Sequence, residues 1–268
     1  MKMLEKKVVL VTASTRGIGY AIVEACAREG AIVYMGARNE KIAKAKAEQM
    51  RKAGYQVYYV YNDALQKESY QTMVEQVIEK EQRIDVLVNN FGTSNPQTDL
   101  DIEHTQYEDF MYTMDINLAS VFLSSQAVIP YMQRTGGGSI INISSIGGVL
   151  PDLSRIGYAV SKAAIIYLSK NIALQEAAHK IRVNVVCPGQ TATDAVMKHM
   201  SEHFQQTFNR HTPMKRMGKA EEIAAAVVYF ASDGAAYTTG QVIEVSGGFG
   251  LGTPVYADLM EVAADKRH

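Results

Sequence analysis

KVVLVTASTRGIG, residues 7–19, is the stretch that decides the fold of this chain. Its first half, residues 7–13, is an apolar, β-branched run without alternation, which is typical of a parallel strand covered on both faces. A helical pattern follows directly after Gly17 and Gly19. Glycines at such a junction let the backbone turn tightly and present N–H groups and a helix N-terminus to a diphosphate. The stretch predicts the first unit of a dinucleotide-binding fold, with a merely structural turn as the alternative.

Short apolar runs of the same kind alternate with helical patterns along the rest of the chain. Strands are expected at residues 7–13, 31–35, 56–61, 84–89, 139–144, 181–186 and 241–245. Helices are expected near residues 18–29, 39–53, 67–81, 105–133, 157–178 and 219–231. This alternation predicts one α/β domain over residues 1–268, a Rossmann-type doubly wound parallel sheet of about seven strands with helices on both faces. In such sheets ligands bind beyond the carboxyl ends of the strands.

Composition narrows the classes of function. The chain has 268 residues, of which 47% are hydrophobic and 21% charged, with a formal net charge of −1. That balance gives no reason to expect nucleic acid or an anionic membrane as a partner. The short apolar run near the N-terminus does not resemble a signal peptide, and no segment is long enough to span a membrane. Cys26 and Cys187 lack metal or redox spacing, so we expect a cytoplasmic globular protein.

The residues at the end of the second expected strand indicate which dinucleotide the site prefers. Sites for the unphosphorylated dinucleotide commonly place a carboxylate there to accept the ribose hydroxyls. This chain has Ala37 followed by Arg38, and a second guanidinium, Arg16, lies in the glycine turn. Two arginines suit a 2′-phosphate, which favours NADP, with NAD as the weaker alternative. The competing interpretation is two solvated arginines, with Glu40 left to bind a ribose.

Three polar residues near the fifth strand carry a possible chemistry. Tyr158 and Lys162 lie one helical turn apart, and Ser145 follows the strand expected at 139–144. A free tyrosine has a pKa of about 10, and a nearby ammonium favours the phenolate and lowers that pKa. A serine hydroxyl can bind a substrate oxygen while its charge changes. Hydride chemistry on an alcohol or ketone needs this set and no metal, although a tyrosine–lysine pair alone is more often plain helix surface.

The order of the motifs resembles the short-chain dehydrogenase/reductase family, from about residue 5 to 250. The motifs are the strand–glycine turn, Asn-Asn-Phe-Gly at 89–92, Ser145, Tyr-x-x-x-Lys at 158–162 and Pro188-Gly189. The resemblance implies that Tyr158 is the general acid/base and that Ser145 binds the carbonyl or hydroxyl. It also implies that Lys162 holds ribose and tunes Tyr158, and that Asn117 supports a proton relay.

The same resemblance implies a set of residues for the cofactor. They are Ser14, Thr15, Arg16, Gly17, Ile18, Gly19, Arg38, Asn39, Asp63, Asn90, Gly92, Tyr158, Lys162, Pro188, Gly189, Thr191 and Thr193. Asp63 is expected beside the adenine, and Thr191 and Thr193 near the nicotinamide amide. The family turn usually begins with glycine, whereas this chain has Ala13, so the shape of that loop is where we expect a departure.

A lid over the substrate is expected at about residues 190–217. The substrate residues expected there and beside it are Ser145, Tyr158, Gln190, Met197 and Met200. Methionine and aromatic side chains adapt to a broad apolar ligand, although apolar residues at this spacing are more often helix packing. His199 and His203 fit an H-x-x-E-H zinc signature, but no third ligand or matching fold is evident, so we expect no metal.

Within the family, the sequence is most similar to bacterial bile-acid hydroxysteroid dehydrogenases, especially the clostridial NADP-dependent 7α type. The similarity lies in VTASTRGIG, AIVYMGARN, VNNFGT, GGSIINISSIGG, PDLSRIGYAVSK and EVSGGFGLGTPVYA. A 12α enzyme is the main alternative, followed by a reductase of 3-oxoacyl thioesters and, in another class, a non-enzymatic NADP sensor. The resemblance implies a homotetramer. The extension at about residues 249–268 is expected to border the steroid pocket or a subunit contact.

Overall fold

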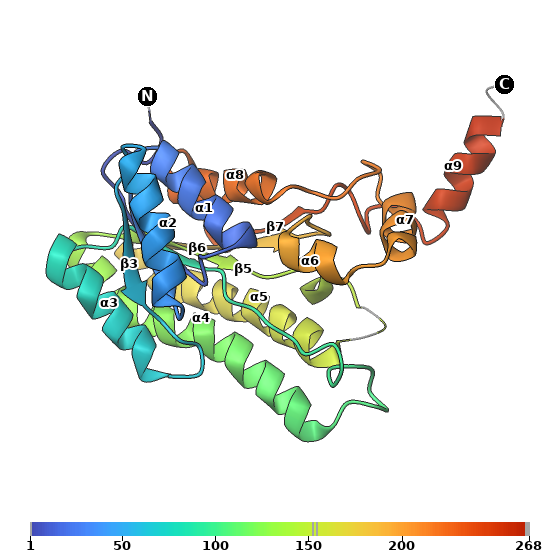
Figure 1. The fold of residues 1–268 in the computed structure, drawn as a ribbon, viewed down its shortest axis with the longest axis horizontal. Helices are drawn as coiled ribbons and strands as arrows, with labels where there is room; N and C mark the ends of the chain where they lie inside the picture. The colour runs from blue at the N-terminus through green and yellow to red at the C-terminus, as the bar shows by residue number, and fades with distance from the viewer. Residues whose placement is uncertain (1, 152, 154, 266–268) are drawn as a thin grey trace.

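Seven strands form one parallel sheet in the computed structural model, which describes residues 2–151, 153 and 155–265 (Figure 1). The strands are β1 (Val8–Thr12), β2 (Ile32–Ala37), β3 (Val57–Tyr61), β4 (Val86–Asn89), β5 (Gly138–Ile143), β6 (Ile181–Pro188) and β7 (Val242–Val245). They lie in the order β3-β2-β1-β4-β5-β6-β7. The predicted doubly wound parallel sheet is confirmed.

Helices cover both faces of this sheet. One face carries α1 (Gly17–Arg28), α2 (Glu40–Lys52) and α8 (Ala220–Ala231), and the other carries α3 (Glu68–Glu81), α4 (Tyr107–Thr135) and α5 (Ile156–Glu176). Short 3-10 helices occur at η1 (Ile146–Gly148), η2 (Ala177–His179) and η3 (Asp233–Ala235). The six helices expected from the sequence all form, each within two residues of its expected bounds.

Burial in the core explains why the sequences of the strands are continuous apolar runs. All five residues of β1 are buried, because helices cover the strand on both sides. Val9 and Val11 pack with Ile22 of α1 on one face, while Leu10 packs with Val128 of α4 on the other. Full burial of each such side chain contributes about 1.5–3 kcal/mol to folding. An alternating strand would leave one of these faces polar.

The chain reverses its direction of sheet growth between β1 and β4. β2 and β3 follow β1 on one side, and the chain then crosses to β4 on the other. Asn90, directly after β4, joins the two loops: its backbone N–H donates to Thr12 Oγ1 (3.0 Å) and its Nδ2 donates to the Ala13 carbonyl (3.1 Å). Ligands of doubly wound sheets bind at this switch point, beyond the carboxyl ends of the strands.

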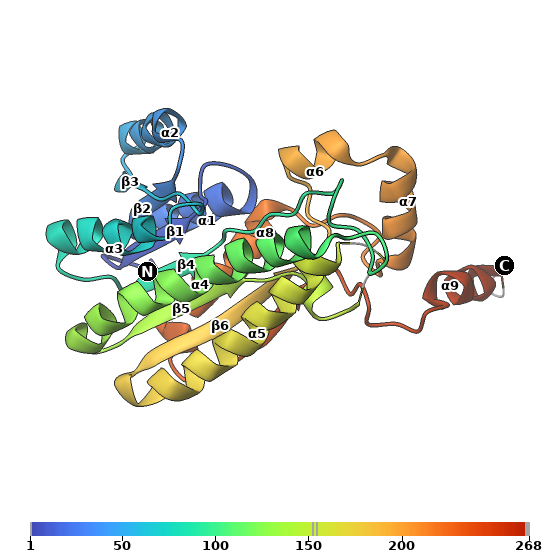
Figure 2. The same ribbon diagram turned by 90° about the horizontal axis from the view of Figure 1, so that it is seen from below.

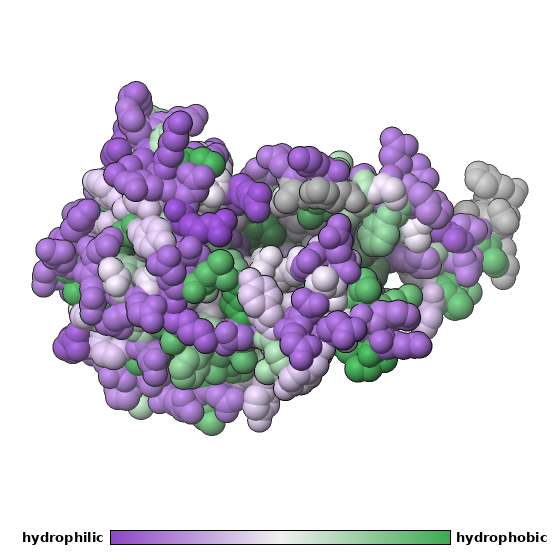
Figure 3. Space-filling view, turned by 60° about the horizontal axis from the view of Figure 1, so that its bottom comes forward, coloured by the Kyte–Doolittle hydropathy of each residue, from purple (hydrophilic) through white to green (hydrophobic). Residues whose placement is uncertain are grey.

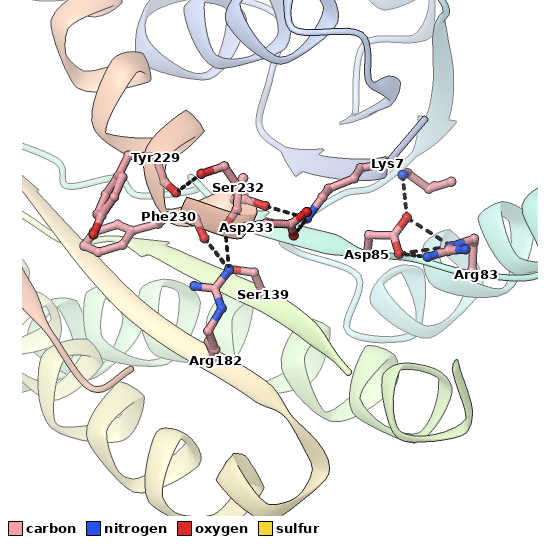
Figure 4. Close-up of polar contacts among 11 residues, drawn as sticks. Lys7, Arg83, Asp85, Ser139, Arg182, Tyr229, Phe230, Ser232 and Asp233 are labelled. Atoms are coloured by element: carbon pink, nitrogen blue, oxygen red, sulfur yellow. Dashed lines mark hydrogen bonds and ion pairs between the residues drawn. The ribbon is translucent and has the colours of Figure 1, made fainter. Parts of the chain in front are cut away.

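The amino ends of the strands are closed by a polar network (Figure 4). Asp85 accepts a hydrogen bond from the Val8 backbone N–H (2.8 Å) and pairs with Arg83. Arg182 of β6 donates to the Phe230 carbonyl (2.7 Å) at the end of α8, and Ser139 of β5 donates to the same oxygen (2.9 Å). These bonds tie four strands and α8 together at the end remote from the switch point.

The regions predicted as lid and extension each contain helices. The connection from β6 to α8 forms α6 (Asp194–His199) and α7 (Glu202–His211), and the chain ends in α9 (Tyr256–Asp265). Figure 2 shows α9 extending away from the body of the molecule beyond α7. Arg210 of α7 joins the two helices through Asp258 (2.5 Å) and Glu261 (3.1 Å). Within the described residues, no helix combines the length and the apolarity that a membrane span requires.

Candidate active site

Ser145 and Tyr158 meet at the carboxyl edge of the sheet, as the sequence predicts. Ser145 follows β5 in extended conformation, and its Oγ accepts a hydrogen bond from the Gly147 backbone N–H (3.1 Å). A side-chain hydrogen bond joins it to the Tyr158 phenol, which α5 presents from its first turn. Both line a cavity of about 240 Å³. A substrate hydroxyl or carbonyl in that cavity has two hydroxyl groups within reach.

Lys162 lies one helical turn behind Tyr158 and is almost fully buried, with 2% of its surface exposed. Its Nζ donates to the Ile143 carbonyl (2.9 Å) and the Phe91 carbonyl (3.4 Å) and lies 5.6 Å from the centroid of the Tyr158 ring. No carboxylate among the described residues pairs with it. Burial lowers the pKa of the ammonium to about 8.

The expectation that the lysine lowers the Tyr158 pKa is wrong for this structure. Burial raises the pKa of the phenol above its ordinary value. The hydrogen bond from Ser145 and the guanidinium of Arg155, 5.3 Å from the ring centroid, oppose that rise without overcoming it. Lys162 directs its protons to backbone carbonyls, so loss of water around the phenol is the larger effect.

Asn117 lies in the middle of α4 and is fully buried. Its Oδ1 accepts a hydrogen bond from the Thr93 N–H (2.9 Å), and its Nδ2 donates to the Thr93 carbonyl (2.9 Å) and to Ser161 Oγ (2.9 Å). Ser161 in turn donates to the Tyr158 carbonyl (2.7 Å). Asn117 therefore connects the loop after β4 with the helix that carries Tyr158. The proton relay implied for it stays a prediction.

The glycine turn before α1 provides a cradle for a diphosphate. Gly17 has a φ of +53°, a conformation that side chains rarely adopt. A Cβ at Gly19 would lie 2.6 Å from the Ala13 carbonyl oxygen and 2.5 Å from Asn90 Nδ2, so only glycine fits there. Arg16, as N-cap, gives α1 no side-chain capping bond, so its first N–H groups keep their capacity for a ligand.

Ala13, which stands where the family turn usually begins with glycine, adopts a φ of +51°. A glycine would take up this left-handed conformation without steric cost, whereas alanine is strained in it by about 1 kcal/mol. Ser14, the next residue, is buried and donates through its hydroxyl to the Gly36 carbonyl (3.4 Å) at the end of β2. The turn is thus fixed against the neighbouring strand.

Arg16 and Arg38 follow β1 and β2, which pair side by side with Thr12 opposite Gly36. Both guanidinium groups are exposed, and neither forms an ion pair with a described residue. Asn39 is the N-cap of α2, and its Oδ1 accepts a bond from the Ile42 N–H (3.0 Å). The two arginines are available to an anionic ligand at this edge, whereas the side-chain oxygen of Asn39 is engaged.

The remaining cofactor candidates lie along the same edge. Asp63, buried after β3, accepts from the Leu65 N–H (3.1 Å). A Cβ at Gly92 would lie 2.6 Å from Lys162 Nζ, so this glycine makes room for the lysine. Thr193 caps α6, and its Cγ2 would lie 3.3 Å from a Cβ at Gly17, so the lid begins directly across from the glycine turn.

Pro188 ends β6, and the Gly189 N–H donates to the Val245 carbonyl (3.0 Å). Thr191 Oγ1 donates back to the Gly189 carbonyl (2.9 Å). Glycines that exclude a Cβ, free helix N–H groups and flanking arginines together fit a nicotinamide dinucleotide along this edge.

The predicted substrate residues separate into two groups. Gln190 lines the cavity with Ser145 and Tyr158, whereas neither methionine is among its lining residues. Met200 accepts a bond from Gln190 Nε2 through its sulfur (3.2 Å), and Met197 is about half exposed. The side chain of His199 lies outside the described residues, so the arrangement of the two histidines of the H-x-x-E-H match is not described. Among the described residues, no three His, Cys, Asp or Glu side chains gather as a metal site requires.

Asp99 is a residue of this site that the sequence did not reveal. Its carboxylate is 1% exposed and accepts hydrogen bonds from the backbone N–H groups of Gly157 (2.7 Å) and Tyr158 (3.0 Å) and from Ser94 Oγ (2.8 Å). Arg155, the N-cap of α5, has a φ of +58° and provides no capping bond itself. Asp99 therefore caps α5 from another loop and fixes the turn that carries Tyr158.

Aromatic residues of the lid and the tail form the far wall of the cavity. Phe204 and Phe208 belong to α7, and Phe249 follows β7. The rings of Phe208 and Phe249 stack with centroids 4.3 Å apart and planes 7° apart. Phe249 was not among the expected site residues, because its partner is 41 positions away and no spacing in the sequence joins them. The wall is apolar and flat, which suits a rigid apolar ligand.

Known proteins share this arrangement. The profile of a family described as Enoyl-(Acyl carrier protein) reductase matches residues 12–250. The 7α-hydroxysteroid dehydrogenase of Clostridium sardiniense is 48% identical, covering 96% of this chain and 98% of its own, and that of Paraclostridium sordellii is 44% identical, covering 97% and 98%. A 7α-hydroxysteroid dehydrogenase solved with NADH and 7-oxo glycochenodeoxycholic acid superposes with a TM-score of 0.87 at 31% identity, covering 92% of this chain and 95% of that one.

These matches extend over nearly the whole chain, and they include the sheet, the glycine turn and the Ser145–Tyr158 edge described above. The chain belongs to the short-chain dehydrogenase/reductase family, a family of oxidoreductases that use a nicotinamide cofactor.

Proposed function

We propose that this protein is an NADP-dependent hydroxysteroid dehydrogenase that oxidises the 7α-hydroxyl of a bile acid and, in the reverse direction, reduces the ketone. The observation that carries the proposal is the cavity in which Ser145 and Tyr158 face an apolar wall of Phe204, Phe208 and Phe249. Hydroxyl chemistry beside a flat apolar surface suits a steroid ring. The name shared by the two relatives at 48% and 44% identity supports the 7α position.

Tyr158, Ser145 and Lys162 have different roles in the oxidation of the substrate hydroxyl. Tyr158 is the general acid/base that takes the proton of the substrate hydroxyl, and Ser145 donates a hydrogen bond to the same oxygen as its charge changes. Lys162, held by two carbonyls, supplies positive charge behind the phenol and lies next to Gly92 at the cofactor edge. When bound, the nicotinamide supplies the acceptor for the hydride. The reverse reaction returns the proton from the neutral phenol.

The preference for NADP rests on Arg16 and Arg38. They lie after neighbouring strands, they are exposed, and within the described chain neither meets a carboxylate. A planar guanidinium binds a phosphate through two parallel hydrogen bonds, which a ribose hydroxyl does not offer. A carboxylate that would accept the hydroxyls of NAD is absent from the positions directly after β2, where the chain has Arg38 and Asn39.

An assay of NADP reduction by absorbance tests the proposal, with NAD as control and with chenodeoxycholate and deoxycholate as separate substrates. Chenodeoxycholate carries hydroxyls at 3α and 7α, and deoxycholate at 3α and 12α. Oxidation of chenodeoxycholate alone is the expected result. Oxidation of deoxycholate alone would replace 7α by 12α, turnover of both would indicate the shared 3α position, and turnover of neither would remove the bile-acid assignment.

We further infer a cytoplasmic homotetramer. Large apolar side chains stand exposed on α4 and α5, among them Tyr112 (56%), Phe122 (47%), Tyr167 (71%) and Leu174 (81%). Figure 3 shows hydrophobic residues gathered between polar ones on the face of the molecule that these helices provide. Exposed apolar side chains gathered on one face support a protein–protein contact there. Light scattering of the purified protein measures the assembly, and a monomer at micromolar concentration would contradict it.

A further inference from the structure

The cavity beside Tyr158 is small for the proposed substrate. Its volume is about 240 Å³, below the roughly 300–1,000 Å³ of most ligand sites. A bile acid joins four fused rings to a carboxylated side chain at the end of the ring system opposite to ring A. The ring that carries the 7α-hydroxyl can enter beside Tyr158, but the rest of the molecule needs further space.

A second cavity of about 420 Å³ lies next to the first, between α7 and the tail. It is lined by Phe204, Thr207, Phe208, His211, Phe249, Gly250, Gly252, Thr253, Pro254 and Tyr256. Phe204, Phe208 and Phe249 line both cavities. These aromatic side chains therefore border both spaces, and Phe208 and Phe249 form a stacked pair.

The tail that builds this second cavity contacts the rest of the protein at two places. A Cβ on Gly250 would lie 2.2 Å from Leu150 Cδ1, so the tail passes in close contact with the loop that borders the cavity beside Tyr158. On the other side, Arg210 of α7 binds Asp258 and Glu261 of α9. The tail thus contacts both the loop after β5 and the helix α7.

The chemistry of the second cavity matches the end of a bile acid that bears the side chain. Its wall is mainly aromatic and apolar, which suits ring D and the alkyl part of the side chain. Next to the lining residue Tyr256, the Lys215 ammonium lies 5.0 Å from the centroid of the ring and donates to the Arg210 carbonyl (2.8 Å). A cation at this place suits a carboxylate that leaves the apolar wall toward water.

We propose that the cavity between α7 and the tail is the subsite for the side-chain end of the steroid, reached past the ring pair of Phe208 and Phe249. The assignment rests on the proposed function. It makes the tail at residues 249–256 a determinant of specificity for steroids that carry a side chain. A steroid of the same ring system without a side chain would reach this cavity with ring D alone and would lack the contacts of the alkyl chain and the carboxylate.

The test compares chenodeoxycholate with 3α,7α-dihydroxy-5β-androstane, which lacks the side chain. Thr253→Trp fills the second cavity, and Val255→Trp adds the same group two residues on, at an exposed position outside the lining. We expect Thr253→Trp to raise the ratio of the two KM values, chenodeoxycholate over androstane, by about tenfold, because about two buried methylene groups return to water. Val255→Trp should leave that ratio unchanged.

A second variant, Tyr256→Ala, covers the case in which Thr253→Trp does not fold. It removes one wall of the cavity and should raise the same ratio by about threefold. If a folded variant changes both KM values by the same factor, or changes neither of them, the subsite assignment is overturned while the proposed function stands. If the wild-type protein oxidises neither steroid, the proposed function fails, and the subsite fails with it.

Discussion

The two ends of the sheet satisfy their polar side chains in different ways. At the amino end, Arg182 donates to three backbone carbonyls, and Asp85 meets both Arg83 and a backbone N–H of β1. At the carboxyl end, among the described residues, the buried ammonium of Lys162 donates to carbonyl oxygens and pairs with no carboxylate, and Arg16 and Arg38 form no ion pair.

The difference separates stability from function within one sheet. A network with every partner inside the protein holds strands in register and has no capacity left for a ligand. A buried ammonium without an internal counter-charge, as at Lys162, raises the energy of the folded protein, whereas the exposed guanidinium groups of Arg16 and Arg38 are solvated by water and can bind an anion. Mutations at the amino end should therefore affect unfolding, and mutations at the carboxyl end should affect turnover.

Tyr158→Phe should have the largest effect. Removal of the phenol oxygen takes away the group that exchanges the proton, so kcat/KM should fall about 10³-fold, equivalent to about 4 kcal/mol of barrier. Tyr167→Phe, an exposed tyrosine on the same helix, is the control and should behave as wild type. Steady-state kinetics with chenodeoxycholate and NADP measure both. Near-normal turnover of Tyr158→Phe would sink the assignment.

Lys162→Met should change how stability depends on pH. Burial holds the folded pKa at about 8, against about 10.4 in the unfolded chain. Between these values the unfolded chain binds a proton that the folded one has lost, so the unfolding free energy of the wild type rises with pH, by about 3 kcal/mol over the window.

The variant lacks this rise, and urea denaturation at pH 7.5 and pH 10 measures the difference in slope. Lys170→Met, exposed on the same helix, should keep the slope of the wild type. Equal slopes for Lys162→Met and wild type would mean that the buried lysine keeps an ordinary pKa.

Arg182→Met tests the amino end. The guanidinium donates to the carbonyls of Phe230, Ser232 and Thr238, so its loss leaves carbonyls without donors and should lower the unfolding free energy by about 2 kcal/mol. The value of kcat/KM should stay within about twofold of wild type. Arg134→Met, at an exposed arginine, should change neither quantity by a measurable amount. A loss of turnover without a loss of stability would break the separation of the two ends.

Asp99→Asn should slow turnover through the position of Tyr158. The amide has one acceptor oxygen for the two backbone N–H groups that the carboxylate now binds. The first turn of α5 then relaxes, and kcat should fall about tenfold while KM for NADP stays unchanged. Asp101→Asn, two residues away and exposed, is the matched control. A lowered Tm with unchanged kcat would reduce Asp99 to a purely structural cap.

The sequence predicts the catalytic residues of this site better than the residues that position them. Ser145, Tyr158 and Lys162 could be brought together from the sequence because parallel strands share one carboxyl edge, and a helix places residues four apart on one face. Asp99 could not, since its bonds to α5 cross 58 and 59 residues without any periodic signal. The sequence predicts a lowered pKa for Tyr158, whereas burial raises it. The neighbouring lysine is visible in the sequence, but the burial of the phenol results from the whole tertiary structure.

Ala13→Gly should have the smallest effect, and it isolates the backbone from the side chains. Ala13 at the carboxyl end and Gln82 at the amino end both adopt left-handed conformations, with φ of 51° and 59°. Glycine at either position removes a steric cost of about 1 kcal/mol, partly offset by the larger entropy of the unfolded chain.

Ala13→Gly and Gln82→Gly should each raise Tm by about 2 °C, and Ala25→Gly inside α1 should lower it. Scanning calorimetry of the three variants measures the shifts. Equal gains at both ends would mean that backbone strain is the same at the two edges of the sheet. The difference between the edges then lies in their polar side chains, satisfied within the protein at one edge and left for a ligand at the other.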